Sequence, residues 1–311
     1  MERLWKQALL GVSQASIDIT PYLSDNYGVM YERILNPIST NSFFLFGARG
    51  TGKTTFLKNY FSDKATLWFD LLDLELEDEF SRNPNSLHQR IDARQQDIDW
   101  VVIDEIQKVP KLLDLVHQYI EKASVKFALT GSSARKLKSG ASNLLAGRAF
   151  VNHLFPLTAS EMGNKFNLDT ALNWGLLPQI SHFSQDNERA EFLRAYGLTY
   201  LKEEVWGEQL VKNMDPFRNF LEIAAQSNTE IINYTNIARD IGIDTKTVQS
   251  YFEILADTLL GCYLEPYHKS IRKQQRQSPK FYFFDMGVTR ALNRQLTSRL
   301  LKNSLQGNIP G

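Results

Sequence analysis

The chain has 311 residues, of which 43% are apolar and 23% are charged. This composition is that of an ordinary globular protein, and the length predicts two domains rather than one. The 35 basic residues balance the 35 acidic ones, so the net charge implies no nucleic-acid or membrane partner, and any nucleic-acid surface must be local. The single cysteine, Cys262, excludes a disulfide framework and a thiolate metal cage.

Residues 1–29 form a lead-in whose first 14 residues have the apolar spacing of an amphipathic helix. This stretch lacks the long apolar core of a secretory signal, and no run in the chain approaches the ~18 apolar residues of a membrane helix. We therefore expect a cytoplasmic protein without membrane contact. Cys262 stands in the apolar run 259–264 and is expected to be buried.

Residues 43–55, FFLFGARGTGKTT, join a short apolar strand to a glycine-rich loop that fits the pattern G-x-x-x-x-G-K-[ST]. Its glycines permit positive φ angles, so successive N–H groups can turn toward an anion, and a helix predicted at 54–61 adds the positive end of its dipole. Lys53 is predicted to reach the β- and γ-phosphates of ATP, and the Thr54 hydroxyl to bind Mg²⁺. The predicted ATP-binding residues are Gly47, Ala48, Arg49, Gly50, Thr51, Gly52, Lys53, Thr54 and Thr55.

A second strand at 66–69 precedes the acidic run 70–79, which we interpret as the solvated face of a helix or loop, with a second metal site as the alternative. A third apolar strand, at 100–104, ends in Asp104 and Glu105. Such a pair is often only a helix cap, but its position after a phosphate loop favours a Walker B motif. Asp104 is then predicted to hold Mg²⁺, directly or through water, and Glu105 to orient or deprotonate the attacking water.

A fourth strand, at 127–130, ends in small polar residues. Ser132 is the predicted γ-phosphate sensor, with Thr130 and Ser133 as alternatives. The other interpretation makes these residues N-caps of a following helix.

Arg148 precedes a fifth, largely apolar run at 150–155. Phosphoryl transfer needs mobile positive charge, so Arg148 is predicted to act as a finger on a neighbouring subunit's γ-phosphate. Arg135 is the second candidate, and a surface ion pair is the alternative for both.

Five strands separated by helical sequence predict an α/β fold, in which a parallel-sheet P-loop NTPase domain occupies residues 30–160. The phosphates are expected at the carboxyl ends of its strands. A helical lid or connector is predicted at 161–215, a mainly helical winged-helix domain at 216–290 and a C-terminal tail at 291–311.

The winged-helix prediction rests on helices at 217–225, 234–241 and 245–255, followed by a strand pair at 259–264 and 281–284. The connection between the strands has basic but no acidic residues, which suggests contacts to the DNA backbone. The third helix is poor in side chains for base readout, so such contacts are expected to be independent of sequence, and a plain packing module is the alternative. The basic residues are Lys269, Arg272, Lys273, Arg276 and Lys280.

Taken in order, these motifs resemble those of prokaryotic AAA+-like ATPases that carry a C-terminal winged-helix and nuclease-like domain of unknown function. The resemblance covers about residues 30–290. It rests on FGARGTGKTT (46–55), VVIDEIQKVP (101–110), LTGSSARKL (129–137), LLAGR (144–148), LTASEM (157–162), YLKEEV (200–205), TVQSYFEILADTLLGCYLEPY (247–267) and PKFYFFDMGV (279–288).

The resemblance implies that Lys53, Thr54, Asp104 and Glu105 contact ATP and Mg²⁺, and that the segments around Ser132 and Arg148 carry the sensor and the finger. Members of the family usually continue into a nuclease-like domain, whereas residues 296–311 contain no acidic residue for such a site. Either that domain is lost or the chain is a truncated form of a longer protein, and no nuclease activity is assigned to these residues.

The sequence favours an Mg²⁺-dependent ATPase that couples hydrolysis to motion of the winged-helix module. The alternative is a nucleotide-gated DNA-binding or regulatory module with little turnover. A small-molecule kinase is a third possibility, against which stand Glu105 at the water position and a winged helix in place of an acceptor lid. An Arg148 finger would require a homo-oligomer.

Overall fold

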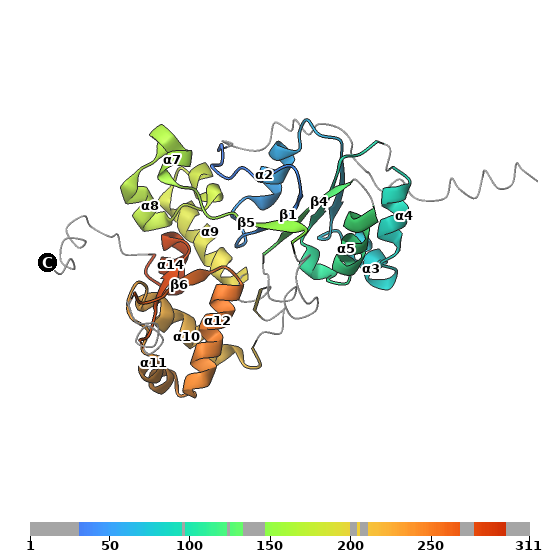
Figure 1. Ribbon diagram of the computed structural model, residues 1–311. Coiled ribbons are helices and arrows are strands. Elements are labelled where there is room, and N and C mark those ends of the chain that lie inside the picture. Colours follow the sequence, from blue (N-terminus) through green and yellow to red (C-terminus); the bar gives the residue numbers. More distant parts are fainter. Residues whose placement is uncertain are drawn as a thin grey trace, which may run out of the picture.

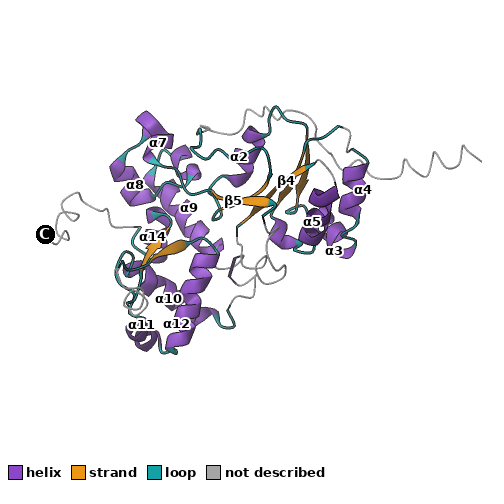
Figure 2. Cartoon of the chain, in the orientation of Figure 1, coloured by secondary structure: helices purple, strands orange, loops and turns teal. Residues whose placement is uncertain are grey.

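The structure is a computed structural model that describes residues 31–94, 97–122, 125–132, 147–199, 204–205, 211–267 and 277–296. A sheet-based part contains the strands up to β5, and a mainly helical part follows it (Figure 1). Among its described residues the helical part contains a two-stranded sheet, seen in Figure 2 among the helices.

The sheet-based part is built on five parallel strands in the order β2-β3-β4-β1-β5. Phe46 at the end of β1 is in register with Gly131 at the end of β4, and Asp70 of β2 with Asp104 of β3. The predicted parallel sheet and all five predicted strands are confirmed. The strands are β1 (Ser42–Phe46), β2 (Thr66–Asp70), β3 (Trp100–Asp104), β4 (Lys126–Gly131) and β5 (Ala149–His153).

Successive side chains of a strand point to opposite faces of the sheet, so a largely apolar strand such as β1 needs cover on both faces. Helices supply that cover. Phe43 and Leu45 pack with Leu57 of α2 (Lys53–Tyr60) on one face. Phe44 and Phe46 face the other way, into a core shared with three further helices. These are α3 (Leu74–Arg82), α4 (Ser86–Asp92) and α5 (Leu112–Lys122), and the short 3-10 helix η1 (Ile106–Lys108) precedes α5.

The acidic run at 70–79 contains the start of α3. Asp73 caps this helix by accepting a hydrogen bond from the Glu75 N–H at 2.9 Å. Farther along α3, Glu79 binds the guanidinium of Arg90 at 2.6 Å. Within the described part of the chain no group of three His, Cys, Asp or Glu side chains could hold a metal ion. These contacts favour the helix interpretation of the run.

The second part is built from short helices and one antiparallel strand pair, β6 (Gly261–Leu264) with β7 (Lys280–Phe283). Its helices are α7 (Ala159–Met162), η2 (Gly163–Lys165), α8 (Leu168–Trp174), η3 (Pro178–His182), α9 (Asp186–Thr199), α10 (Met214–Gln226), α11 (Tyr234–Ile241), α12 (Thr245–Asp257) and α14 (Met286–Leu292). Three helices and a strand pair thus lie where the sequence predicts them. One apolar core runs from Trp174 to Leu296, so the segment after residue 161 packs together with the helices and strands that follow.

Cys262 is exposed, so the expectation that it is buried is wrong. Successive residues of β6 point to opposite faces of the ribbon, and with respect to the described residues Gly261 is buried and Cys262 is exposed. None of the helices in the described ranges combines the length and apolar character needed to cross a bilayer.

Candidate nucleotide site

The glycine-rich loop joins the end of β1 to the start of α2, at the carboxyl edge of the sheet. Gly50 and Gly52 have φ angles of 78° and 89°, which residues with a Cβ atom rarely adopt. Gly47 is needed for space instead, because a Cβ there would lie 2.4 Å from the carbonyl oxygen of Leu154. The three glycines therefore allow the tight turn that the phosphate-loop motif predicts.

Lys53 is the first residue of α2, and its side chain is buried within the loop. Its Nζ donates to the carbonyl oxygen of Gly47 at 2.9 Å and lies 4.0 Å from Oε1 of Glu105. The ammonium group therefore stands between the loop and the end of β3.

The predicted metal-binding pair meets in space. Oγ1 of Thr54 donates to Oδ2 of Asp104 at 2.7 Å, and Thr130 donates to the other carboxylate oxygen, Oδ1. The Asp104 side chain is buried, which fixes its orientation. Hydroxyl and carboxylate oxygens are the ligands that Mg²⁺ uses beside nucleotide phosphates, so Thr54 and Asp104 are suited to hold it.

Glu105 follows in a left-handed conformation, with φ 59° and ψ 46°. Non-glycine residues seldom adopt this backbone, and such positions cluster at functional sites. The Glu105 N–H donates to Oγ1 of Thr130 at 3.1 Å, so one threonine orients both residues of the Asp-Glu pair. The carboxylate of Glu105 accepts a hydrogen bond from Nε2 of Gln107.

A polar network extends from Glu105 to a residue of the second part. Nε2 of Gln107 also donates to Oγ of Ser132 at 3.1 Å, and Ser132 donates to Oε2 of Glu204 at 2.9 Å. Oε1 of Glu204 lies 3.9 Å from Nη1 of Arg49 in the loop. Ser132 thus contacts side chains rather than capping a described helix.

Burial raises the pKa of Glu204, and the charge of Glu105 raises it further. The hydrogen bond from Ser132 and the charges of Arg49 and Lys53 act in the opposite direction without cancelling the effect. Two acidic and two basic side chains therefore share the end of the loop.

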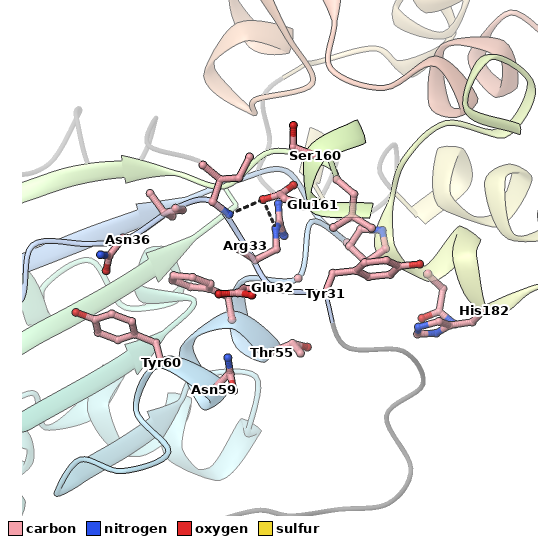
Figure 3. Close-up of a pocket in the computed structure, with 18 of the residues that line it drawn as sticks. Tyr31, Glu32, Arg33, Asn36, Thr55, Asn59, Tyr60, Ser160, Glu161 and His182 are labelled. Carbon is pink, nitrogen blue, oxygen red and sulfur yellow. Dashed lines mark hydrogen bonds and ion pairs between the residues drawn. The ribbon is translucent and has the colours of Figure 1, made fainter. Parts of the chain in front are cut away.

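A cavity of about 1070 Å³ opens on the other side of the loop, between α2, η3 and residues 31–36, which continue the lead-in toward β1 and share its name below. Figure 3 shows Tyr31 and Asn36 of the lead-in, Thr55 and Asn59 of α2, and His182 of η3 around it. Tyr60 and the apolar Phe56 also line it. Such a mixture of aromatic and amide side chains suits a flat polar ring.

Arg33 fixes the lead-in beside this cavity, and Figure 3 shows it pointing at Glu161. Its Nε lies 2.9 Å from Oε1 of Glu161, and its Nη1 donates to the carbonyl oxygen of Thr51 at 2.9 Å. Its Nη2 donates to the carbonyl oxygen of Phe155 at 2.5 Å. One buried guanidinium therefore joins the lead-in, the phosphate loop and α7.

The second part contacts the loop directly. The hydroxyl of Tyr196 donates to the carbonyl oxygen of Arg49 at 3.0 Å. A Cβ at Gly50 would lie 3.8 Å from Leu177, and one at Gly52 would lie 3.7 Å from Pro178. A change in the conformation of the loop therefore alters its contacts with the start of η3 and with α9.

Asp285 anchors the segment before η3. It follows β7, and Oδ2 accepts a hydrogen bond from the Leu176 N–H at 2.6 Å, while Oδ1 accepts one from the Val288 N–H at 3.0 Å. Burial of the side chain raises the pKa of Asp285 despite these bonds. This buried carboxyl ties the start of α14 to the segment next to the loop.

Arg148 lies apart from these residues. It precedes β5, whose first residue, Ala149, is in register with Ser42 at the start of β1, whereas the loop follows the end of β1. At ~3.3 Å per residue the strand separates Arg148 from the loop of its own chain. Arg148 forms an ion pair with Oε1 of Glu121 at 2.5 Å. A surface ion pair is the alternative that the sequence offers for this residue.

Of the predicted basic hairpin the structure describes Lys280, which is exposed at the start of β7, opposite Leu264. Several other predicted residues are not described. Ser133 and Arg135 lie outside the described residues. So do the remaining members of the predicted basic hairpin, namely Lys269, Arg272, Lys273 and Arg276.

Sequence reasoning did not assign roles to Arg33, Gln107, Tyr196 or Glu204. Gln107 and Glu204 lie within stretches that carry the family resemblance, VVIDEIQKVP and YLKEEV, and that was the available signal. Arg33 and Tyr196 reach the loop from 18 and 147 residues away, and no local pattern marks them.

Two family models match the chain, one over the sheet-based part and one over the mainly helical part. Residues 39–163 match the family described as an AAA domain. The AAA match covers the sheet, the phosphate loop and the Asp104-Glu105 pair, and so indicates a P-loop nucleotide-binding region. Residues 153–299 match a domain of unknown function, DUF8612.

Two curated relatives are similar to this chain, an uncharacterized protein of Mycobacterium tuberculosis and one of Mycobacterium bovis. Each is 26% identical over 194 residues, which is 62% of this chain and 44% of the relative. The match therefore spans less than half the length of these relatives.

Proposed function

We propose that the protein is an Mg²⁺-dependent ATPase. The observation that carries the proposal is the convergence of Thr54, Asp104 and Thr130 beside a phosphate loop whose lysine is buried. A loop alone binds phosphate, whereas a loop with two oriented oxygen ligands and a neighbouring glutamate also has the parts for hydrolysis.

Each residue has a role that its position supports. The loop N–H groups and Lys53 bind the phosphates, while Thr54 and Asp104 hold Mg²⁺, which supplies charge neutralisation at the β- and γ-phosphates. Glu105 orients the attacking water. Ser132 acts as the sensor residue, with Thr130 holding Asp104 and Glu105 in place.

The cavity beside the loop receives the adenine base and ribose. Its position between α2 and the lead-in continues the line of the phosphate loop. Asn36 and Asn59 supply amide groups, and Tyr60 supplies an aromatic face for stacking, in keeping with a concave site that has few polar groups.

Phosphate release in the presence of Mg²⁺ tests the catalytic proposal. Lys53→Ala is expected to abolish release because the phosphates lose their ammonium partner, whereas Glu105→Gln is expected to retain ATP binding and lose turnover. Lys58→Ala is the matched control, since Lys58 is exposed on the same helix. A wild-type rate equal to that of Lys53→Ala would refute the proposal.

Arg148 is proposed to act on the γ-phosphate of a neighbouring subunit, since the β5 strand separates it from the loop of its own chain. The protein would then be a homo-oligomer when ATP is bound. Mass measurement with and without ATP, together with Arg148→Ala, tests this. A monomer in both states would assign Arg148 to its ion pair with Glu121.

The helices α10, α11 and α12 and the β6–β7 pair are proposed to be a winged helix that moves when ATP is hydrolysed. The support is the contact of Tyr196 with the loop, because the Tyr196 ring also packs against Phe284, with ring centroids 6.3 Å apart. Phe284 directly follows β7, which makes a continuous path from the loop to the ribbon.

Nucleotide-gated binding of DNA through the basic connection 268–280 is the second candidate. It is favoured by the order of three helices followed by a ribbon whose connection carries the basic residues. Affinity for duplex DNA should fall steeply with salt and after charge reversal at Arg272 and Lys273. Absence of binding at low salt would exclude this function.

A further inference from the structure

Glu204 brings a carboxylate from the second part of the chain to the phosphate end of the candidate site. The residue is 9% exposed, and Oε2 accepts a hydrogen bond from Ser132, 72 residues earlier in the chain. Ser132 follows Gly131, whose carbonyl oxygen accepts a hydrogen bond from the Gly47 N–H at 3.3 Å. The carboxylate is therefore linked to Gly47, the first glycine of the phosphate loop, through Ser132 and Gly131.

The positive charges around Glu204 belong to the loop itself. Nη1 of Arg49 lies 3.9 Å from Oε1 of Glu204, and Lys53 is close enough to influence its ionisation. Glu105 is a second nearby acid, and it disfavours the negative charge on Glu204. A phosphate group that entered this cluster would place two or more oxygens beside the same cations. It would therefore compete with Glu204 for these cations and for Ser132.

We propose that Glu204 is a specificity-determining residue that distinguishes ATP from ADP, because the terminal phosphate of ATP displaces its carboxylate from Ser132 and Arg49. The inference rests on the proposed ATP site. ADP leaves Glu204 in place, since its phosphates end one group earlier along the loop. The segment that carries Glu204 is thereby coupled to the presence of the γ-phosphate.

The displacement has a consequence for the water-orienting residue. Ser132 shares Nε2 of Gln107 with the carboxylate of Glu105, so a Ser132 hydroxyl released by Glu204 is free to contact the phosphate and to change its bond to Gln107. Gln107 then alters its hold on Glu105. Glu204 is thus a positioning residue for Glu105 as well as a competitor of the phosphate.

The experiment measures the dissociation constants of the full chain for ADP and for a non-hydrolysable ATP analogue, both with Mg²⁺. Glu204→Gln keeps the size of the side chain and removes the charge. Loss of a charge–charge repulsion at close range is expected to tighten binding of the analogue about tenfold or more, and to change ADP binding less than about threefold. Glu191→Gln, an exposed glutamate on α9, is the matched control and should leave both constants unchanged.

Glu204→Ala removes the contact with Ser132 as well and should shift the analogue-to-ADP ratio in the same direction. Circular dichroism melting shows whether each variant is folded, and one folded variant is sufficient. Equal ratios in wild type and a folded variant would overturn the inference while leaving ATP binding intact. Failure of the proposed ATP site looks different, because then neither nucleotide binds in a manner that depends on Lys53.

Discussion

Replacing Gly175 by alanine tests whether Asp285 fixes the segment next to the phosphate loop. Gly175 ends α8 with φ 77° and ψ −168°, a region that essentially only glycine occupies. An added Cβ would also lie 2.0 Å from Oδ1 of Asp285. The alanine variant must therefore change the backbone and move a carboxylate that has no open space around it.

The two costs can be estimated separately. The backbone conformation is worth about 1–3 kcal/mol in a residue other than glycine. Moving the Asp285 carboxylate breaks its bonds to the N–H groups of Leu176 and Val288, each worth about 1.5–3 kcal/mol when the acceptor is charged. We expect a loss of about 4 kcal/mol or more in the free energy of unfolding, which is a large part of the ~5–15 kcal/mol of a typical domain.

Urea unfolding followed by circular dichroism measures this loss. Gly242→Ala is the control, because Gly242 also has positive φ, 78°, but a Cβ there would meet nothing within 4 Å. It should cost about 1–2 kcal/mol. A folded Gly175→Ala protein should also bind ATP more weakly, since Leu177 and Pro178 would shift away from the loop. A Gly175→Ala cost within about 1 kcal/mol of the control would refute the reasoning.

Three further outcomes are expected. Thr130→Val removes the hydroxyl that holds Asp104, so ATP turnover should fall about tenfold or more while nucleotide affinity in EDTA is unchanged; equal turnover would contradict this role. Arg33→Met removes the cationic partner of the Glu161 carboxylate together with the guanidinium's bonds to Thr51 and Phe155, and should cost about 3–5 kcal/mol in urea unfolding, against no effect if the pair is only a surface contact. Burial raises the pKa of Glu204 in the folded protein above 4.5, the ordinary pKa of a glutamate. Wild-type stability should therefore decline as the pH rises from 4.5 to the raised pKa, and Glu204→Gln should lack this decline. Urea titrations of both proteins between about pH 4 and pH 8 measure the difference, and parallel curves would contradict the assignment.

The phosphate loop and the parallel strands could be predicted because their signals are local. The motif at 47–54 is contiguous, and its glycines announce the backbone angles that the loop adopts at Gly50 and Gly52. The buried strands are short apolar runs bounded by polar turns, so their residues identify them without knowledge of their neighbours. The position of Asp104 and Glu105 at the end of β3 was predictable for the same reason, as the end of such a run.

The exposed position of Cys262 shows where local reasoning fails. An apolar run indicates a strand, but which of its residues face the core depends on what covers each face of the ribbon. Arg148 is a second example: its place in the sequence suggested a finger, but only the register of β5 against β1 shows that its own loop is at the other end of the strand.

The sequence by itself predicted the chemistry proposed for the candidate phosphate site, because that chemistry needs particular residues at fixed short spacing. Only the tertiary structure decided which distant side chains complete the site. Arg33 meets Glu161 across 128 residues, and Ser132 meets Glu204 across 72. Such pairs form when packed elements bring two segments together, and neither segment alone carries a pattern that specifies its partner.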